Sequence, residues 1–64
     1  PLEYTPSNIT EYIGNQYSDF KIEEVNIVEI RNKKTYRVDI SKKKESKLLE
    51  FDLLGKFVKE VENL

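Results

Sequence analysis

The first quarter of the chain carries apolar residues at helical spacing. They recur three and four positions apart as Ile9, Tyr12, Ile13 and Tyr17. This pattern predicts a helix over residues 5–17 with one narrow apolar stripe. Thr5 is expected to cap its start, and Pro6 suits the first helical position, where a missing N–H costs nothing. Because isolated helices shorter than about 12–15 residues are marginal, this helix needs a sheet to pack on.

Beyond the helix the apolar residues alternate with polar ones, which is typical of half-buried strands. Residues 20–30 are rich in β-branched side chains and are predicted to form the first strand. The parity of the apolar positions changes between Ile22 and Val25, and again between Ile27 and Val28. Since side chains alternate strictly across a strand, each change predicts a bulge, a bend or a switch of buried face.

Three more strands are predicted in the second half of the chain. The expected segments are a polar turn at 31–34, a strand at 35–40, a charged connection at 41–47, a strand at 48–52, a hairpin loop at 53–55 and a last strand at 56–61. In the second strand Tyr36, Val38 and Ile40 are expected to face inward. Gly55 can supply the positive φ that the loop requires. Phe57 is expected to lie across from Phe51.

This order of elements predicts the α+β class, with one N-terminal helix packed on one face of a four-stranded antiparallel sheet. Residues 1–64 are interpreted as a single domain. A chain of this length buries only about 60% of its unfolded surface, so its stability is expected to be marginal. With no Cys to form a disulfide, the apolar core has to stabilise the fold unaided, or with help from an adjoining domain or a second subunit.

The composition argues against enzymatic chemistry. Without His or Cys the chain can form neither a Ser–His nor a Cys–His couple, and it lacks the usual zinc ligands. Glu23 and Glu24 are adjacent, but on a strand they point to opposite faces. The oxygens of Asn15, Asp19 and Glu24 do not have the spacing of a calcium loop. We expect no enzymatic activity, no cofactor and no metal.

The charge balance argues against nucleic acid as a partner. Lys and Arg number 11, Asp and Glu 12, and the formal net charge is -1. The Lys-rich run at 42–47 has no aromatic residue for stacking on bases, so we interpret it as a solvated turn. No apolar run approaches the roughly 20 residues needed to cross a bilayer, and we expect no membrane insertion. Unpaired strand edges predict a monomer or a weak dimer.

Four pieces of the sequence, in order, carry a resemblance to a known family. They are the Pro-started helix at 6–17, the step from Tyr17 through Phe20 and Ile22 to Val25, the strand Tyr36-Arg37-Val38 and the hairpin Phe51-Asp52-Leu53-Leu54-Gly55. Together they resemble the PepSY-like domains and the related beta-lactamase-inhibitor-protein-like fold. The resemblance implies a helix on a four-stranded antiparallel sheet, often in tandem copies. It also implies an extracytoplasmic (periplasmic or secreted) bacterial setting and a role in contacting or inhibiting other proteins.

The sheet face turned away from the helix is the candidate binding surface. Strict alternation is expected to place these residues on it: Thr35, Arg37, Asp39, Leu48, Glu50, Val58 and Glu60, with either Ile27 or Val28. A mixed apolar and charged surface on a rigid sheet suits protein recognition. We therefore predict a small non-enzymatic protein-binding or inhibitory module. The alternative is a structural repeat or spacer of a larger exported protein, because scattered outer apolar residues are normal in a small domain.

Overall fold

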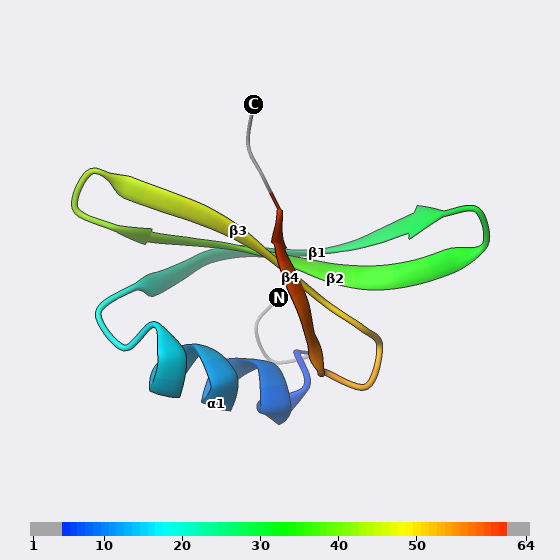
Figure 1. Cartoon of the computed structure of the whole chain (residues 1–64), viewed down its shortest axis with the longest axis horizontal. Helices are drawn as coiled ribbons and strands as arrows, with labels where there is room; N and C mark the ends of the chain where they lie inside the picture. The colour runs from blue at the N-terminus through cyan, green and yellow to red at the C-terminus, as the bar shows by residue number, and fades with distance from the viewer. Residues whose placement is uncertain (1–4, 62–64) are drawn as a thin grey trace.

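One helix and one antiparallel sheet make up the part of the chain that the computed structural model describes, residues 5–61 (Figure 1). The elements are α1 (Ser7–Gln16), β1 (Lys21–Ile30), β2 (Lys33–Lys42), β3 (Glu45–Phe51) and β4 (Phe57–Val61). Neighbouring strands pair in the order β1-β2-β3-β4. In Figure 1, α1 lies below the sheet, and no other described element covers the opposite side. The predicted α+β class is confirmed.

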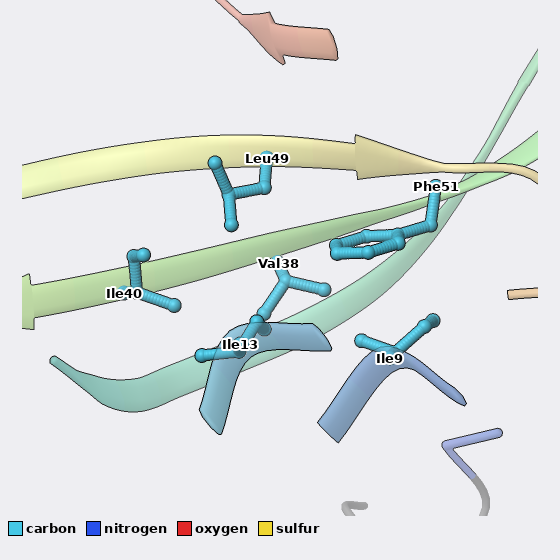
Figure 2. Packing of buried hydrophobic residues seen from close by; sticks show 6 residues of the cluster. All are labelled: Ile9, Ile13, Val38, Ile40, Leu49 and Phe51. Atoms are coloured by element: carbon cyan, nitrogen blue, oxygen red, sulfur yellow. The ribbon is translucent and has the colours of Figure 1, made fainter. Parts of the chain in front are cut away.

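The core lies between α1 and the two central strands. Ile9 and Ile13 point from the helix toward the sheet (Figure 2). There they meet four buried residues of β2 and β3, namely Val38, Ile40, Leu49 and Phe51, and none of the six side chains is more than 3% exposed. Tyr12 extends this core, because its ring stacks on Phe57 with 4.7 Å between the centroids. Burying each such side chain contributes about 1.5–3 kcal/mol, so the predicted helical stripe anchors α1.

The start of α1 differs from the prediction. The helix begins at Ser7, and Pro6 occupies the N-cap position with a ψ of 137°. The carbonyl oxygen of Pro6 accepts the N–H of Ile9 at 3.0 Å, which closes the first turn one residue later than expected. Thr5 is therefore outside the capping position, no side chain caps the helix, and the prediction of a Thr5 cap is wrong.

The first parity change in β1 is a bulge, and the second is not. The register between β1 and β2 shifts between Ile22 and Glu24, as predicted. Ile27 and Val28, in contrast, pair without a shift. Ile27 lies on the helix side of the sheet, but the β1–β2 hairpin extends past α1 (Figure 1), and its side chain is 60% exposed. The apolar parity changes there because the helix no longer covers the sheet.

Two of the predicted connections are shorter than expected. β1 and β2 are joined by Arg31 and Asn32 alone, at φ values of 54° and 66°. Only residues 43 and 44 separate β2 from β3. The charged connection expected at 41–47 is therefore wrong, because most of it is paired strand. Two-residue loops with positive φ match the right-handed twist of antiparallel strands, which explains their use here.

The β3–β4 loop is fastened to the start of α1. Gly55 has a φ of 88°, as its predicted role in the hairpin requires. The Oδ1 of Asp52 accepts the N–H groups of Leu54 and Lys56, both at 2.9 Å. The side-chain amide of Asn8 donates to the carbonyl oxygen of Leu54 at 3.3 Å. The loop thereby sets the start of β4, where Phe57 pairs with Phe51 as predicted.

Candidate functional site: the outer sheet face

The outer face is the side of the sheet turned away from α1, and the core fixes which residues lie on it. Val38 and Leu49 pair with each other and face the helix. Their neighbours along the strands must therefore point away from it. Five of the predicted residues lie together on β2 and β3 of this face: Thr35, Arg37, Asp39, Leu48 and Glu50. Arg37 pairs with Glu50, and Asp39 pairs with Leu48.

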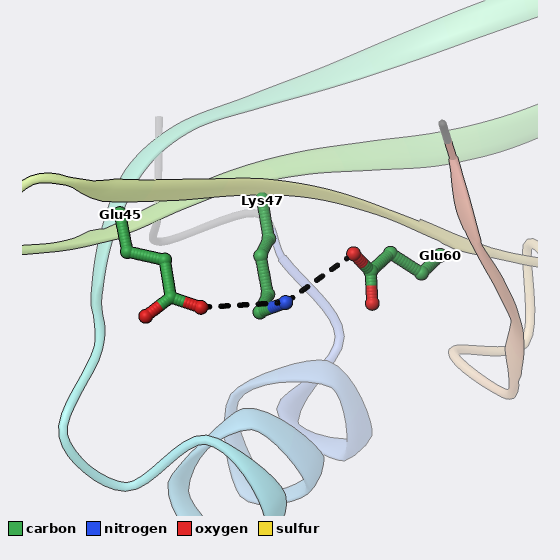
Figure 3. A network of polar contacts seen from close by, with 3 residues as sticks. All are labelled: Glu45, Lys47 and Glu60. Carbon is green, nitrogen blue, oxygen red and sulfur yellow. Dashed lines mark hydrogen bonds and ion pairs between the residues drawn. The ribbon is translucent and has the colours of Figure 1, made fainter. Parts of the chain in front are cut away.

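The fourth-strand members of the outer face differ from the prediction. A register shift at the start of β4 leaves Val58 without a pairing partner, and its side chain is 48% exposed. Glu50 pairs instead with Lys59, and Leu48 pairs with Val61. Glu60 pairs with Leu49 and turns to the helix side (Figure 3). The placement of Glu60 on this face is wrong, because the one-residue bulge reverses the parity of β4.

A polar row with three charged members crosses all four strands of the outer face. Its members are Asn26, Arg37, Glu50 and Lys59, in strand order. The Nη2 of Arg37 lies 3.3 Å from the Oε1 of Glu50, and the two side chains are only 28% and 13% exposed. The Nε of Arg37 is buried without a hydrogen-bond partner among the described residues. Partial burial weakens solvent screening of the pair, so Arg37 is held in place at the centre of the face.

The next row is acidic on one side and apolar on the other. Glu24 pairs directly with Asp39, followed by Leu48 and Val61. The side-chain amide of Asn26 donates to the Oε2 of Glu24 at 2.9 Å. Like charges directly opposite each other in a sheet are destabilising, and the fold nevertheless accepts this pair. This row therefore places two adjacent carboxylates on β1 and β2 of the outer face.

A shallow basic depression lies at the other end of the face, beside the β1–β2 turn. Its lining combines residues of all four strands and the turn: Ile30, Arg31, Lys33, Thr35, Arg37, Glu50 and Lys59. Of the residues predicted on the outer face, Thr35, Arg37 and Glu50 line this depression. Arg31 and Lys33 were recognised as part of a polar turn, but their proximity to Lys59 depends on the register of β4. The depression holds four cationic side chains and one carboxylate.

The helix side of the sheet carries a separate charged cluster (Figure 3). The Nζ of Lys47 lies 3.6 Å from Glu45 and 3.4 Å from Glu60. The hydrogen bond to Glu60 is the main reason that the pKa of Lys47 is raised. The pKa of Tyr17 is also raised, first by burial of its hydroxyl and then by the charge of Glu60. The cluster ties β3 to β4 close to the end of α1 and has a structural role.

Neither metal binding nor membrane insertion gains support from the described residues. Within residues 5–61, no three Asp or Glu side chains come close enough together to hold a metal ion. The same part of the chain contains no helix that is both long enough and apolar enough to cross a membrane.

Comparison with known proteins leaves the surface to be interpreted from its own geometry. No family model, no curated protein and no solved structure matches the chain. The PepSY-like resemblance remains a prediction. The function of the outer face is therefore argued from its own residues.

Proposed function

We propose that this domain is a non-enzymatic protein-binding or inhibitory module that engages its partner through the outer sheet face. The observation that supports this most is an open four-stranded face with charged side chains held in register among Val28, Leu48 and Val61. Hydrogen-bonded strands fix these side chains before binding, which lowers the ordering cost of association. The Arg37–Glu50 pair adds an oriented polar feature to the centre of the surface.

The exposed side of α1 offers a poorer binding surface. Its exposed residues are small or polar: Ser7, Asn8, Thr10, Glu11, Gly14, Asn15 and Gln16. Protein interfaces favour aromatic residues, Met and Arg at their centres, and this side of the helix has none of them. The outer sheet face carries Arg37 at its centre and branched apolar side chains around it. The side chains that can anchor a partner therefore lie on the sheet.

The resemblance to PepSY-like domains extends this proposal to location and role. It supports a periplasmic or secreted setting and contact with, or inhibition of, another protein. The unpaired edges of β1 and β4 add the proposal that the domain is a monomer or a weak dimer, since exposed strand edges can pair with other chains. The proposal includes neither nucleic acid nor a membrane as a partner.

Cross-linking capture from the producing organism tests the proposal, with two variants of equal charge change. Leu48→Lys adds a cation at the middle of the outer face, opposite Asp39. Asn15→Lys adds the same charge on the exposed side of α1. The proposal expects a captured protein to be lost with Leu48→Lys and retained with Asn15→Lys. Loss with Asn15→Lys alone would move the interface to the helix, and no captured protein would favour the spacer alternative.

A further inference from the structure

We propose that the basic depression beside the β1–β2 turn binds an acidic peptide segment of the partner protein. This inference rests on the proposed function and adds the chemistry of the partner. The segment would present carboxylates to Arg31, Lys33 and Lys59, with an apolar side chain against Ile30. All four residues line the same depression.

The charge distribution favours an anionic ligand at this place. The lining contains Arg31, Lys33, Arg37 and Lys59 against Glu50 alone, a local charge of +3. Since the whole chain carries -1, the rest of it carries -4. Within residues 5–61, none of Arg31, Lys33 and Lys59 forms an ion pair, whereas Arg37 is already engaged by Glu50. Three cations thus remain available in a depression that contains one carboxylate, whereas the rest of the chain is net acidic.

The backbone of the turn holds Arg31 in an unfavourable conformation. Arg31 has a φ of 54°, in the left-handed region. That region costs a non-glycine residue about 1–2 kcal/mol, and turns of this shape prefer Asn-Gly. Strained residues of this kind are concentrated at functional sites. Arg31 lines the depression, where its guanidinium can meet a carboxylate of the ligand.

The surroundings favour a peptide over a nucleic acid. Ile30 lines the depression and is 55% exposed, which suits an apolar side chain placed between carboxylates. No aromatic side chain lines the depression, so bases have nothing to stack on. A phosphate backbone continuing along the outer face would soon meet Glu24 and Asp39, which repel it. The basic area is therefore short and bounded, as a segment of a few acidic residues requires.

A nuclear magnetic resonance titration tests the inference with a defined probe, the blocked peptide Glu-Glu-Leu-Glu-Glu, at about 20 mM salt, where screening is weak. Shift changes are expected at Ile30, Arg31 and Thr35. The variant Arg31→Glu/Lys33→Glu is expected to weaken binding by at least about tenfold through charge repulsion. The control Lys43→Glu/Lys44→Glu makes the same charge change at the β2–β3 turn and is expected to alter affinity by less than about twofold.

Four results would overturn the inference. Equal weakening by both variants would mean that peptide affinity depends only on the net charge of the domain. Shift changes near Lys42 and Lys43 alone would place the site at the other turn. Tighter binding of a single-stranded oligothymidine of equal charge would assign the depression to nucleic acid. A captured partner that covers the outer face but is insensitive to Arg31→Glu/Lys33→Glu would leave the proposed function standing and reject the acidic segment.

Discussion

At the scale of single residues, the two glycines of the described chain have opposite roles. Gly14 is exposed in α1, and no atom lies within 4 Å of the position that a Cβ would take. Replacing Gly14 by Ala should therefore raise the free energy of unfolding by about 1 kcal/mol, the difference in helix propensity. Urea denaturation measures this change. Lower stability in Gly14→Ala would show that this side of the helix is not free.

Gly55 is confined by both its backbone and its neighbours. Its φ is 88°, and an added Cβ would lie 3.0 Å from the Cβ of Asn8 and 3.3 Å from that of Pro6. Gly55→Ala should lower the free energy of unfolding by about 1–3 kcal/mol, because left-handed strain and a close contact combine. The same urea experiment checks it, with Gly14→Ala as the matched glycine control. Unchanged stability would mean that the loop is not seated against α1.

Residue-level features that depend on local spacing could be predicted from the sequence. Ile9 and Ile13 follow helical periodicity, and Gly55 sits where a hairpin needs positive φ, so each carries its own signal. The Thr5 cap could not be judged this way, because Ser7 and Thr5 flank the proline and both favour a helix start. The helix begins after Pro6 because Pro6 has an extended ψ. The types of the neighbouring residues do not determine this angle.

At the scale of elements, the residues of the β1–β2 turn reduce the stability of the fold. Both of its residues, Arg31 and Asn32, have positive φ. Replacing them by Asn and Gly should raise the free energy of unfolding by about 1 kcal/mol, since this pair suits the turn best. Thermal unfolding measures the gain. The replacement should also weaken the acidic peptide, because it removes the Arg31 guanidinium. A more stable variant with unchanged peptide affinity would show that Arg31 does not bind the peptide.

Strand existence could be predicted, whereas strand ends and the parity of β4 could not. Alternation in β2 and the apolar content of β3 are strong signals, and both strands occur. The charged residues at 41–47 are typical of a loop, yet most of them pair in β2 and β3. Backbone hydrogen bonds can form there because they do not depend on the exposed side chains. In β4 the bulge beside Phe57 reverses the alternation of inward and outward side chains, and no residue type there predicts it. Lys59 therefore lies on the outer face beside Glu50, and the basic depression could not be foreseen.

At the scale of the whole molecule, one short helix covers part of one side of a wide sheet. The ten residues of α1 bury Ile9 and Ile13 against the two central strands. The β1–β2 hairpin continues beyond the helix, and the outer face lacks a covering element among residues 5–61 (Figure 1). A small domain of this kind is expected to be only marginally stable. Binding on the open face would therefore stabilise the fold measurably through linkage.

The charged cluster on the helix side predicts loss of stability at high pH. The folded-state pKa values of Tyr17 and Lys47 are raised above 10.0 and 10.5, so the folded chain holds these protons more tightly than the unfolded chain. Their contribution is complete below pH 10.0 and is lost as the pH rises through the raised values. Urea midpoints should fall across this range.

Variants separate this effect from general alkaline unfolding. Lys47→Met removes the proton that Glu60 stabilises and should flatten the decline. Lys43→Met removes a lysine at the exposed β2–β3 turn and should leave the slope unchanged. Identical pH profiles for the wild type and Lys47→Met would contradict the assignment of the cluster.

The central claim is that the outer sheet face binds a protein, and methyl cross-saturation in the captured complex tests it most directly. Saturating the partner should transfer magnetisation to the methyl groups of Val28, Ile30 and Leu48, which lie on that face. Leu54, which is 82% exposed on the β3–β4 loop next to α1, should receive little. Transfer to Leu54 without transfer to Val28 and Leu48 would place the partner on the helix side and contradict the account.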